Sequence, residues 1–245
     1  STAGATFAWS RAGIIGISNG PASGTGNPNE TLVNTTDSSI VVRYVFTVAA
    51  NGCSNPSSYN VDVAVSLVSA LSSSLSPPAI CSGTTFSYTP TSTTTGTIFS
   101  WTRAVVPGIS NIAGAGTSDP SEPLTNTTSG TINVEYVYTL TANGCTNPTT
   151  YTVVVPVYPS PALSSSLNPP AVCSGSSFNY TATSSTAGAS FSWTRAAVAG
   201  ISNVAGLGTG DISEVLTNTT TEPVGVTYVY TVTANGCSEI FNVNV

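Results

Sequence analysis

The chain has 245 residues and a net charge of −6, and its only cations are four arginines. Neutralising nucleic-acid phosphates requires clustered cations, so this composition excludes a basic nucleic-acid-binding surface. Histidine and lysine are both absent, which removes the bases that Ser or Cys nucleophiles usually need.

Apolar residues make up 40% of the chain and alternate with Thr and Ser, which predicts folded β-structure rather than disorder. No run of about 18 apolar residues occurs, so we expect no membrane span in this segment. Residues 1–8 carry neither a basic nor an apolar leader pattern. We therefore expect the sequence to be an interior piece of a longer, processed chain.

A unit of 92 residues recurs along the chain. Its markers, each series spaced by 92 residues, are Trp9, Trp101, Trp193 and Cys53, Cys145, Cys237. A period near 90 fits one autonomous β-sandwich domain better than a solenoid turn. We expect an incomplete first repeat at 1–65, a second at 66–157 and a third at 158–245. The opening strands of the first repeat would lie upstream or come from a neighbour.

Within the second repeat, apolar residues alternate with period two, which predicts strands over 84–89, 97–103, 132–142 and 151–157. The Gly- and Ser-rich segment 107–123 predicts an irregular connection with one or two short edge strands. Asn143 and Gly144 form the predicted turn between the last two strands. The fold class is therefore all-β: tandem immunoglobulin-like β-sandwiches. Proline-rich junctions between repeats predict an extended, rod-like array.

The five cysteines predict one disulfide in each domain. Applied to the repeat, this rule pairs Cys81 with Cys145 and Cys173 with Cys237, and leaves Cys53 for a cysteine upstream. The alternative is free buried thiols. Disulfides favour an oxidising, extracellular location. Two cysteines per repeat without histidine cannot complete a zinc site, so we expect no metal and no cofactor.

An arginine follows each tryptophan by two residues and precedes a glutamate by 19 residues. The three pairs are Arg11 with Glu30, Arg103 with Glu122 and Arg195 with Glu214. They form either an arginine and aromatic ligand site or a structural ion pair at the end of the sandwich, and we expect the second. We likewise expect each tryptophan to be a core residue packed on the disulfide rather than a platform for sugars.

Two carboxylate pairs, Asp119 with Glu122 and Asp211 with Glu214, are the candidates for glycoside hydrolysis or calcium binding. The first repeat has Asn27 beside Glu30 at the same position, so the pair does not recur in every repeat. The sequence therefore predicts no enzyme activity.

The words CSG, FSWTRA and YVYTLTANGC, with the Pro-rich junctions, resemble the PKD-like repeats of giant Bacteroidota cell-surface adhesins. Those adhesins are of the gliding-motility type, exported by the type IX system. The resemblance implies a secreted, non-catalytic extracellular filament whose partners are further repeats of the same chain and surface polysaccharide or substratum. Two alternatives remain open: carbohydrate-binding accessory repeats of a secreted enzyme, and a fibre subunit that polymerises by strand addition.

Overall fold

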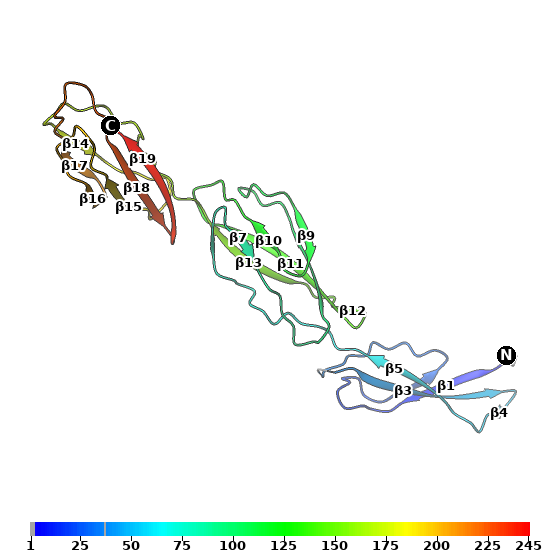
Figure 1. Cartoon of the computed structure of the whole chain (residues 1–245). Coiled ribbons are helices and arrows are strands. Elements are labelled where there is room, and N and C mark those ends of the chain that lie inside the picture. Colours follow the sequence, from blue (N-terminus) through cyan, green and yellow to red (C-terminus); the bar gives the residue numbers. More distant parts are fainter. Residues whose placement is uncertain (1–2, 37) are drawn as a thin grey trace. The chain divides into compact units, whose positions relative to one another are not determined.

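The computed structural model of the chain (Figure 1) describes residues 3–36 and 38–245, in which every regular element is a β-strand. The predicted all-β class is confirmed. In the described part of the chain, no helix has the length and apolar character needed to cross a membrane. The chain divides into two compact units. The first contains the residues up to Ser73 with Thr89–Trp101 and Tyr138–Tyr151, and the second contains Ser74–Tyr88, Thr102–Val137 and Thr152–Val245.

The first repeat forms one five-stranded sheet. Its strands are β1 (Thr6–Arg11), β2 (Ala22–Thr25), β3 (Ile40–Ala50), β4 (Cys53–Ser54) and β5 (Tyr59–Val65). The long strand β3 pairs with β1, β4 and β5, and β2 extends the sheet beyond β1. Trp9, Val42 and Tyr44 are buried on this sheet.

The second repeat has a six-stranded and a two-stranded sheet. The larger contains β6 (Ile80–Cys81), β8 (Ile98–Arg103), β9 (Gly114–Thr117), β11 (Ile132–Ala142), β12 (Cys145–Thr146) and β13 (Tyr151–Tyr158). The smaller pairs β7 (Thr85–Ser87) with β10 (Ser121–Pro123). All four predicted strands are present. Strands β9 and β10 lie in the segment for which short edge strands were predicted, whereas β6 and β12 were not predicted.

The third repeat also has a two-stranded and a larger sheet, but the larger sheet has four strands and no counterpart of β6 among the described residues. A two-stranded sheet pairs β14 (Ser177–Tyr180) with β17 (Ile212–Val215). A four-stranded sheet has the order β16 (Gly206–Thr209), β15 (Ser190–Arg195), β18 (Thr227–Ala234), β19 (Cys237–Asn244). In Figure 1, β18 and β19 form the orange-red hairpin that ends the chain.

The alternation in β18 shows how the sequence sets the core. Tyr228, Tyr230, Val232 and Ala234 are buried, and the residues between them are less so. Because side chains alternate across a strand, a shift of one residue would move all four to the opposite face. The turn after β18 places Asn235 and Gly236 at φ 52° and 78°, the left-handed geometry of a tight hairpin.

The disulfide joins Cys81 to Cys237, across 156 residues and with a Cα–Cα distance of 5.7 Å. The predicted pairs, Cys81 with Cys145 and Cys173 with Cys237, are therefore wrong. Cys53, Cys145 and Cys173 are exposed free thiols, so the alternative of free buried thiols is wrong for them too.

The length of a strand explains why the pair predicted within the third repeat does not form. Cys237 begins β19, whereas Val172 and Ser174, on either side of Cys173, line a pocket with Val245 at the other end of that strand. A strand of this length spans more than roughly 20 Å. A disulfide requires Cα atoms within about 7 Å, so the two positions are too far apart.

Candidate functional site

A buried cluster of one arginine, one glutamate and one tyrosine lies in the third repeat. Arg195 donates from Nε and Nη2 to the two carboxylate oxygens of Glu214, at 2.9 and 3.1 Å. Its Nη2 also donates to the carbonyl oxygen of Val204 at 2.7 Å, and Nη1 donates to that of Ala196 at 3.2 Å. The hydroxyl of Tyr228 donates to Glu214 at 2.5 Å. Every oxygen of the glutamate therefore has a donor.

The same arginine cluster occurs in the other two repeats. In the first, Arg11 holds Glu30 at 3.0 and 2.8 Å, and Tyr44 donates to Glu30 at 2.8 Å. The second repeat has an equivalent cluster. Arg103 holds Glu122 at 2.7 and 2.9 Å, and Tyr136 donates to Glu122 at 2.6 Å. Each arginine also donates to two backbone carbonyls nearby.

The cluster connects the two sheets of a complete repeat. Arg195 and Tyr228 lie on β15 and β18 of the four-stranded sheet, whereas Glu214 lies on β17 of the two-stranded sheet. The second repeat has the same distribution over β8, β11 and β10. A bidentate pair fixes distance and direction together, so the cluster sets how the two sheets face each other.

Burial makes these charges dependent on one another. The arginine side chains are at most 1% exposed, and the glutamates are 16–21% exposed. Hydrogen bonds from the arginine lower the pKa of Glu30 and of Glu214. Burial raises the pKa of Glu122, but the bonds from Arg103 and Tyr136 outweigh it, and the net direction is down. All three carboxylates are therefore ionised at neutral pH and occupied by internal donors.

The pKa values of the tyrosines in the cluster are shifted up, whereas those of the glutamates are shifted down. Burial, followed by the hydrogen bond to the ionised glutamate, raises the pKa of Tyr44, Tyr136 and Tyr228. Sequence reasoning missed these tyrosines as members of the site. They could have been found, because each lies 14 residues after its glutamate in all three repeats.

Trp9 and Trp193 lie beside the cluster, in the core. Trp193 is 8% exposed and meets the ring of Tyr228 edge-on at 5.6 Å between centroids. Its other side covers Gly208, where a Cβ would lie 2.7 Å from the indole ring. Trp9 has the same relation to Tyr44 and Gly24. The core cluster that contains Trp193 includes no cysteine among the described residues, so this tryptophan does not show the expected packing on the disulfide.

Asp211 and Glu214, the candidate carboxylate pair of the third repeat, bind different partners. Asp211 accepts from the backbone N–H of Ala182 at 3.0 Å, whereas Glu214 belongs to the arginine cluster. Over residues 3–36 and 38–245, no group of three or more His, Cys, Asp or Glu side chains is placed to hold a metal ion.

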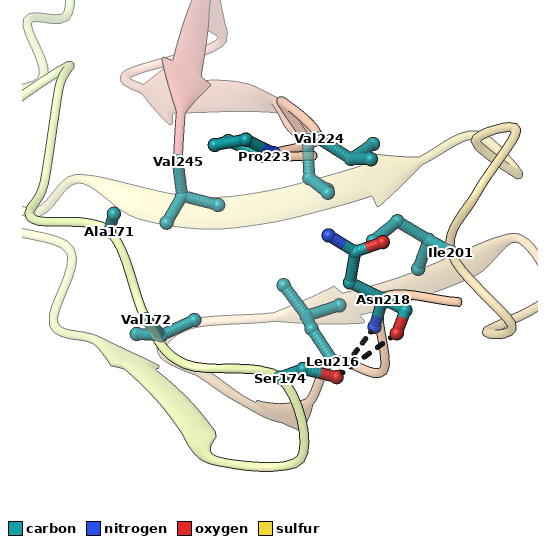
Figure 2. A pocket seen from close by; sticks show the side chains of 10 residues that line it. Ala171, Val172, Ser174, Ile201, Leu216, Asn218, Pro223, Val224 and Val245 are labelled. Atoms are coloured by element: carbon teal, nitrogen blue, oxygen red, sulfur yellow. Dashed lines mark hydrogen bonds between the residues drawn. The ribbon is translucent and has the colours of Figure 1, made fainter. Parts of the chain in front are cut away.

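A cavity of about 110 Å³ opens at one end of the third repeat (Figure 2). In it Ser174 Oγ bonds the backbone of Asn218, and Val172, Leu216 and Val245 supply apolar surface. In the second repeat, the residues equivalent to Ser174 and Asn218 hold the end of β13: Ser82 N–H donates to Tyr158 O, and Asn126 Nδ2 donates to Val157 O. The cavity thus corresponds to a strand-pairing position.

A second, more apolar groove of about 320 Å³ lies on the first repeat, over Tyr44, Phe46, Leu32 and Val63. In the other two repeats a phenylalanine of β7 or β14 packs on the equivalent tyrosine. Phe86 lies 5.0 Å from Tyr136 and Phe178 lies 5.4 Å from Tyr228, between ring centroids.

The model of the PKD-like domain family matches residues 78–161 and 170–245. No curated protein matches the chain. Among solved structures, extracellular domains 3–5 of Drosophila OTK match with 10% identity over 98% of this chain and 84% of that chain, at a TM-score of 0.35. Cadherin-like domains 1 to 4 of zebrafish RET match with 10% identity over 99% of this chain and 65% of that chain, at a TM-score of 0.21. Both TM-scores lie below 0.5.

Proposed function

Because the chain belongs to the PKD-like domain family, we propose that it is a non-catalytic, structural and adhesive segment of a large secreted cell-surface protein. The whole protein forms a filament of the gliding-motility type, which attaches a bacterium to the substratum. Its partners are further repeats of the same chain and surface polysaccharide.

The observation that carries the proposal is the arginine cluster, built in the same way in all three repeats. Three of the four arginines and their glutamates are used inside the protein, and in the second and third repeats they join two sheets. The fourth, Arg43, pairs with Asp62 at the surface. Such a module has a rigidly fixed core, and few of its charged groups are left to act on a substrate.

The outer surface and the disulfide agree with this role. The loops and outward strand faces are rich in Ser and Thr, and only 6% of residues are charged. A polar, nearly uncharged repeated surface suits weak contacts that add up through tethering. The disulfide between Cys81 and Cys237 favours an oxidising compartment, as in secreted proteins.

Sugar binding through the tryptophans has less support. A stacking platform needs an exposed ring face, but Trp9 and Trp193 are 9% and 8% exposed and cover glycines. Strand addition is the second candidate, favoured by the apolar groove over Tyr44. A synthetic peptide with the sequence of residues 80–89 tests it: saturable binding to the chain, lost when the phenylalanine is replaced by serine, supports strand addition.

The main proposal is tested on the source cells. Antibodies raised against this chain should label thin surface fibres in electron microscopy, and cells that lack these repeats should attach and move less on glass. Labelling of compact particles, or attachment unaffected by the deletion, would overturn it. Beads coated with the chain should be retained on a polysaccharide layer, and beads coated with the reduced, unfolded chain serve as the control.

A further inference from the structure

The disulfide joins two different copies of the repeat. Cys81 belongs to the opening segment of the second repeat, on β6, where it lies opposite Tyr158 at the end of that repeat's last strand. Cys237 belongs to the hairpin between the last two strands of the third repeat. The bond therefore runs from the hairpin of one repeat back to the opening strand of the repeat before it.

The hairpin half of this bridge is present in every repeat. Cys237 follows the turn Asn235–Gly236 and pairs with Ala234. Cys145 follows Asn143–Gly144 and pairs with Ala142, and Cys53 follows Asn51–Gly52 and pairs with Ala50. The asparagines have φ of 51–52° and the glycines 77–79° in all three turns. The backbone thus presents the three cysteines in the same way.

The opening half also recurs. After Cys81, the backbone N–H of Gly83 donates to Leu124 O at 2.7 Å, and that of Thr84 donates to Cys81 O at 3.1 Å. After Cys173, Gly175 donates to Leu216 O at 2.8 Å and Ser176 donates to Cys173 O at 3.0 Å. Cys173 therefore sits in the same loop as Cys81, and it is exposed.

A separate contact places the hairpin of the second repeat beside the opening segment of the same repeat, next to the end of the first. Asn147, two residues after Cys145, donates from Nδ2 to the carbonyl oxygen of Ser69 at 2.7 Å, and this bond is buried. Ser69 lies four residues beyond the end of β5, the last strand of the first repeat. Cys145 is thereby held close to the junction after the first repeat, as Cys237 is held at the end of β13.

We propose that Cys81–Cys237 is one member of a series of disulfides in which each repeat is bonded to the next. Cys145 and Cys53 are hairpin halves whose partners are the opening cysteines of the preceding copies, and Cys173 is an opening half whose partner is the hairpin cysteine of a following copy. Each bond forms when two thiols lose two protons and two electrons to a disulfide oxidant such as oxidised glutathione, which leaves as two thiols. Pulling on the array would then load covalent bonds between repeats as well as the linkers.

The chain itself provides the first test. Alkylation of the oxidised, unfolded chain and chymotryptic peptide mapping by mass spectrometry should find a linked peptide containing Cys81 and Cys237. Cys53, Cys145 and Cys173 should all be alkylated. Bridges within repeats would instead leave Cys53 as the one alkylated cysteine, and that result would overturn the proposal.

An extended chain separates the two pairing rules further. Adding a second copy of residues 66–92 before Ser1 supplies the first repeat with an opening cysteine. We expect the added cysteine to bond Cys145, so that Cys145 alone loses its alkylation. A bond to Cys53, an added cysteine that stays free, or disulfide-linked dimers on a non-reducing gel would each contradict the series. The matched control is the same extension with serine in place of its cysteine, in which Cys145 stays alkylated.

Discussion

Replacing Glu214 by glutamine removes the negative charge from the arginine cluster of the third repeat while nearly keeping the shape of the side chain. Arg195 is 1% exposed there, and among the described residues Glu214 is the one acid bonded to it. Breaking a buried pair by removing one partner costs about 3–5 kcal/mol, because the remaining charge is uncompensated. Since Glu214 is 20% exposed and two backbone carbonyls still hold Arg195, we expect the low end, about 3 kcal/mol.

The matched control is Asp62→Asn in the first repeat. Arg43 and Asp62 form the same bidentate geometry, at 2.7 and 2.8 Å, but their side chains are 57% and 44% exposed. Water screens an exposed pair, so we expect no measurable change in stability for Asp62→Asn. A second variant, Arg195→Met with Glu214→Leu, removes both charges and should be less destabilising than Glu214→Gln alone.

Hydrogen exchange followed by mass spectrometry is the suitable assay, because it reports the opening of each repeat separately where a single melting curve would not. A loss of about 3 kcal/mol corresponds to roughly a hundredfold faster exchange of the most protected amides in β15 and β18. Equal effects of Glu214→Gln and Asp62→Asn would refute the buried-charge reasoning. A double variant less stable than Glu214→Gln would also refute it.

Three further predictions concern pH, packing and the disulfide. The lowered pKa of Glu30, Glu122 and Glu214 contributes stability that is present above the unfolded-state pKa of about 4.3 and is lost as the pH falls further. The raised pKa of Tyr136 and Tyr228 contributes stability that is lost as the pH rises above about 10. The midpoint of urea unfolding should therefore be constant between pH 5 and 7. A midpoint that changes steeply within this range would be inconsistent with this account. Gly208→Ala should destabilise the third repeat by about 1–3 kcal/mol in thermal unfolding, because the added Cβ would overlap the Trp193 ring. Gly225→Ala, whose Cβ would meet nothing within 4 Å, should leave the stability unchanged. Equal effects of the two variants would count against the packing argument. Cys237→Ser should lower the free energy of unfolding of the bonded repeats by about 2–4 kcal/mol, whereas Cys173→Ser should leave it unchanged. Calorimetry measures both variants. An equal loss in the two would support a bridge within the third repeat instead.

The sequence alone was enough for the fold class and for most of the strands. Alternation in 132–142 and 151–157 predicts β11 and β13 because a strand exposes opposite faces in turn, and this information is local. The turn at Asn143–Gly144 is local for the same reason, since few residues accept a positive φ. The period of 92 residues could be read directly, although the boundaries at 65 and 157 remain a prediction.

Tertiary structure decided which side chains meet. The spacing of Arg195 and Glu214 suggested an ion pair, but the part of Tyr228 depends on two sheets facing each other. The disulfide is the clearest case: a repeat pattern gives the order of cysteines along the chain and not their distance in space. Cys173 and Cys237 share a repeat yet lie toward opposite ends of a strand, whereas Cys81 and Cys237 come within 5.7 Å across 156 residues. Bond formation depends on that distance, which only the folded chain determines.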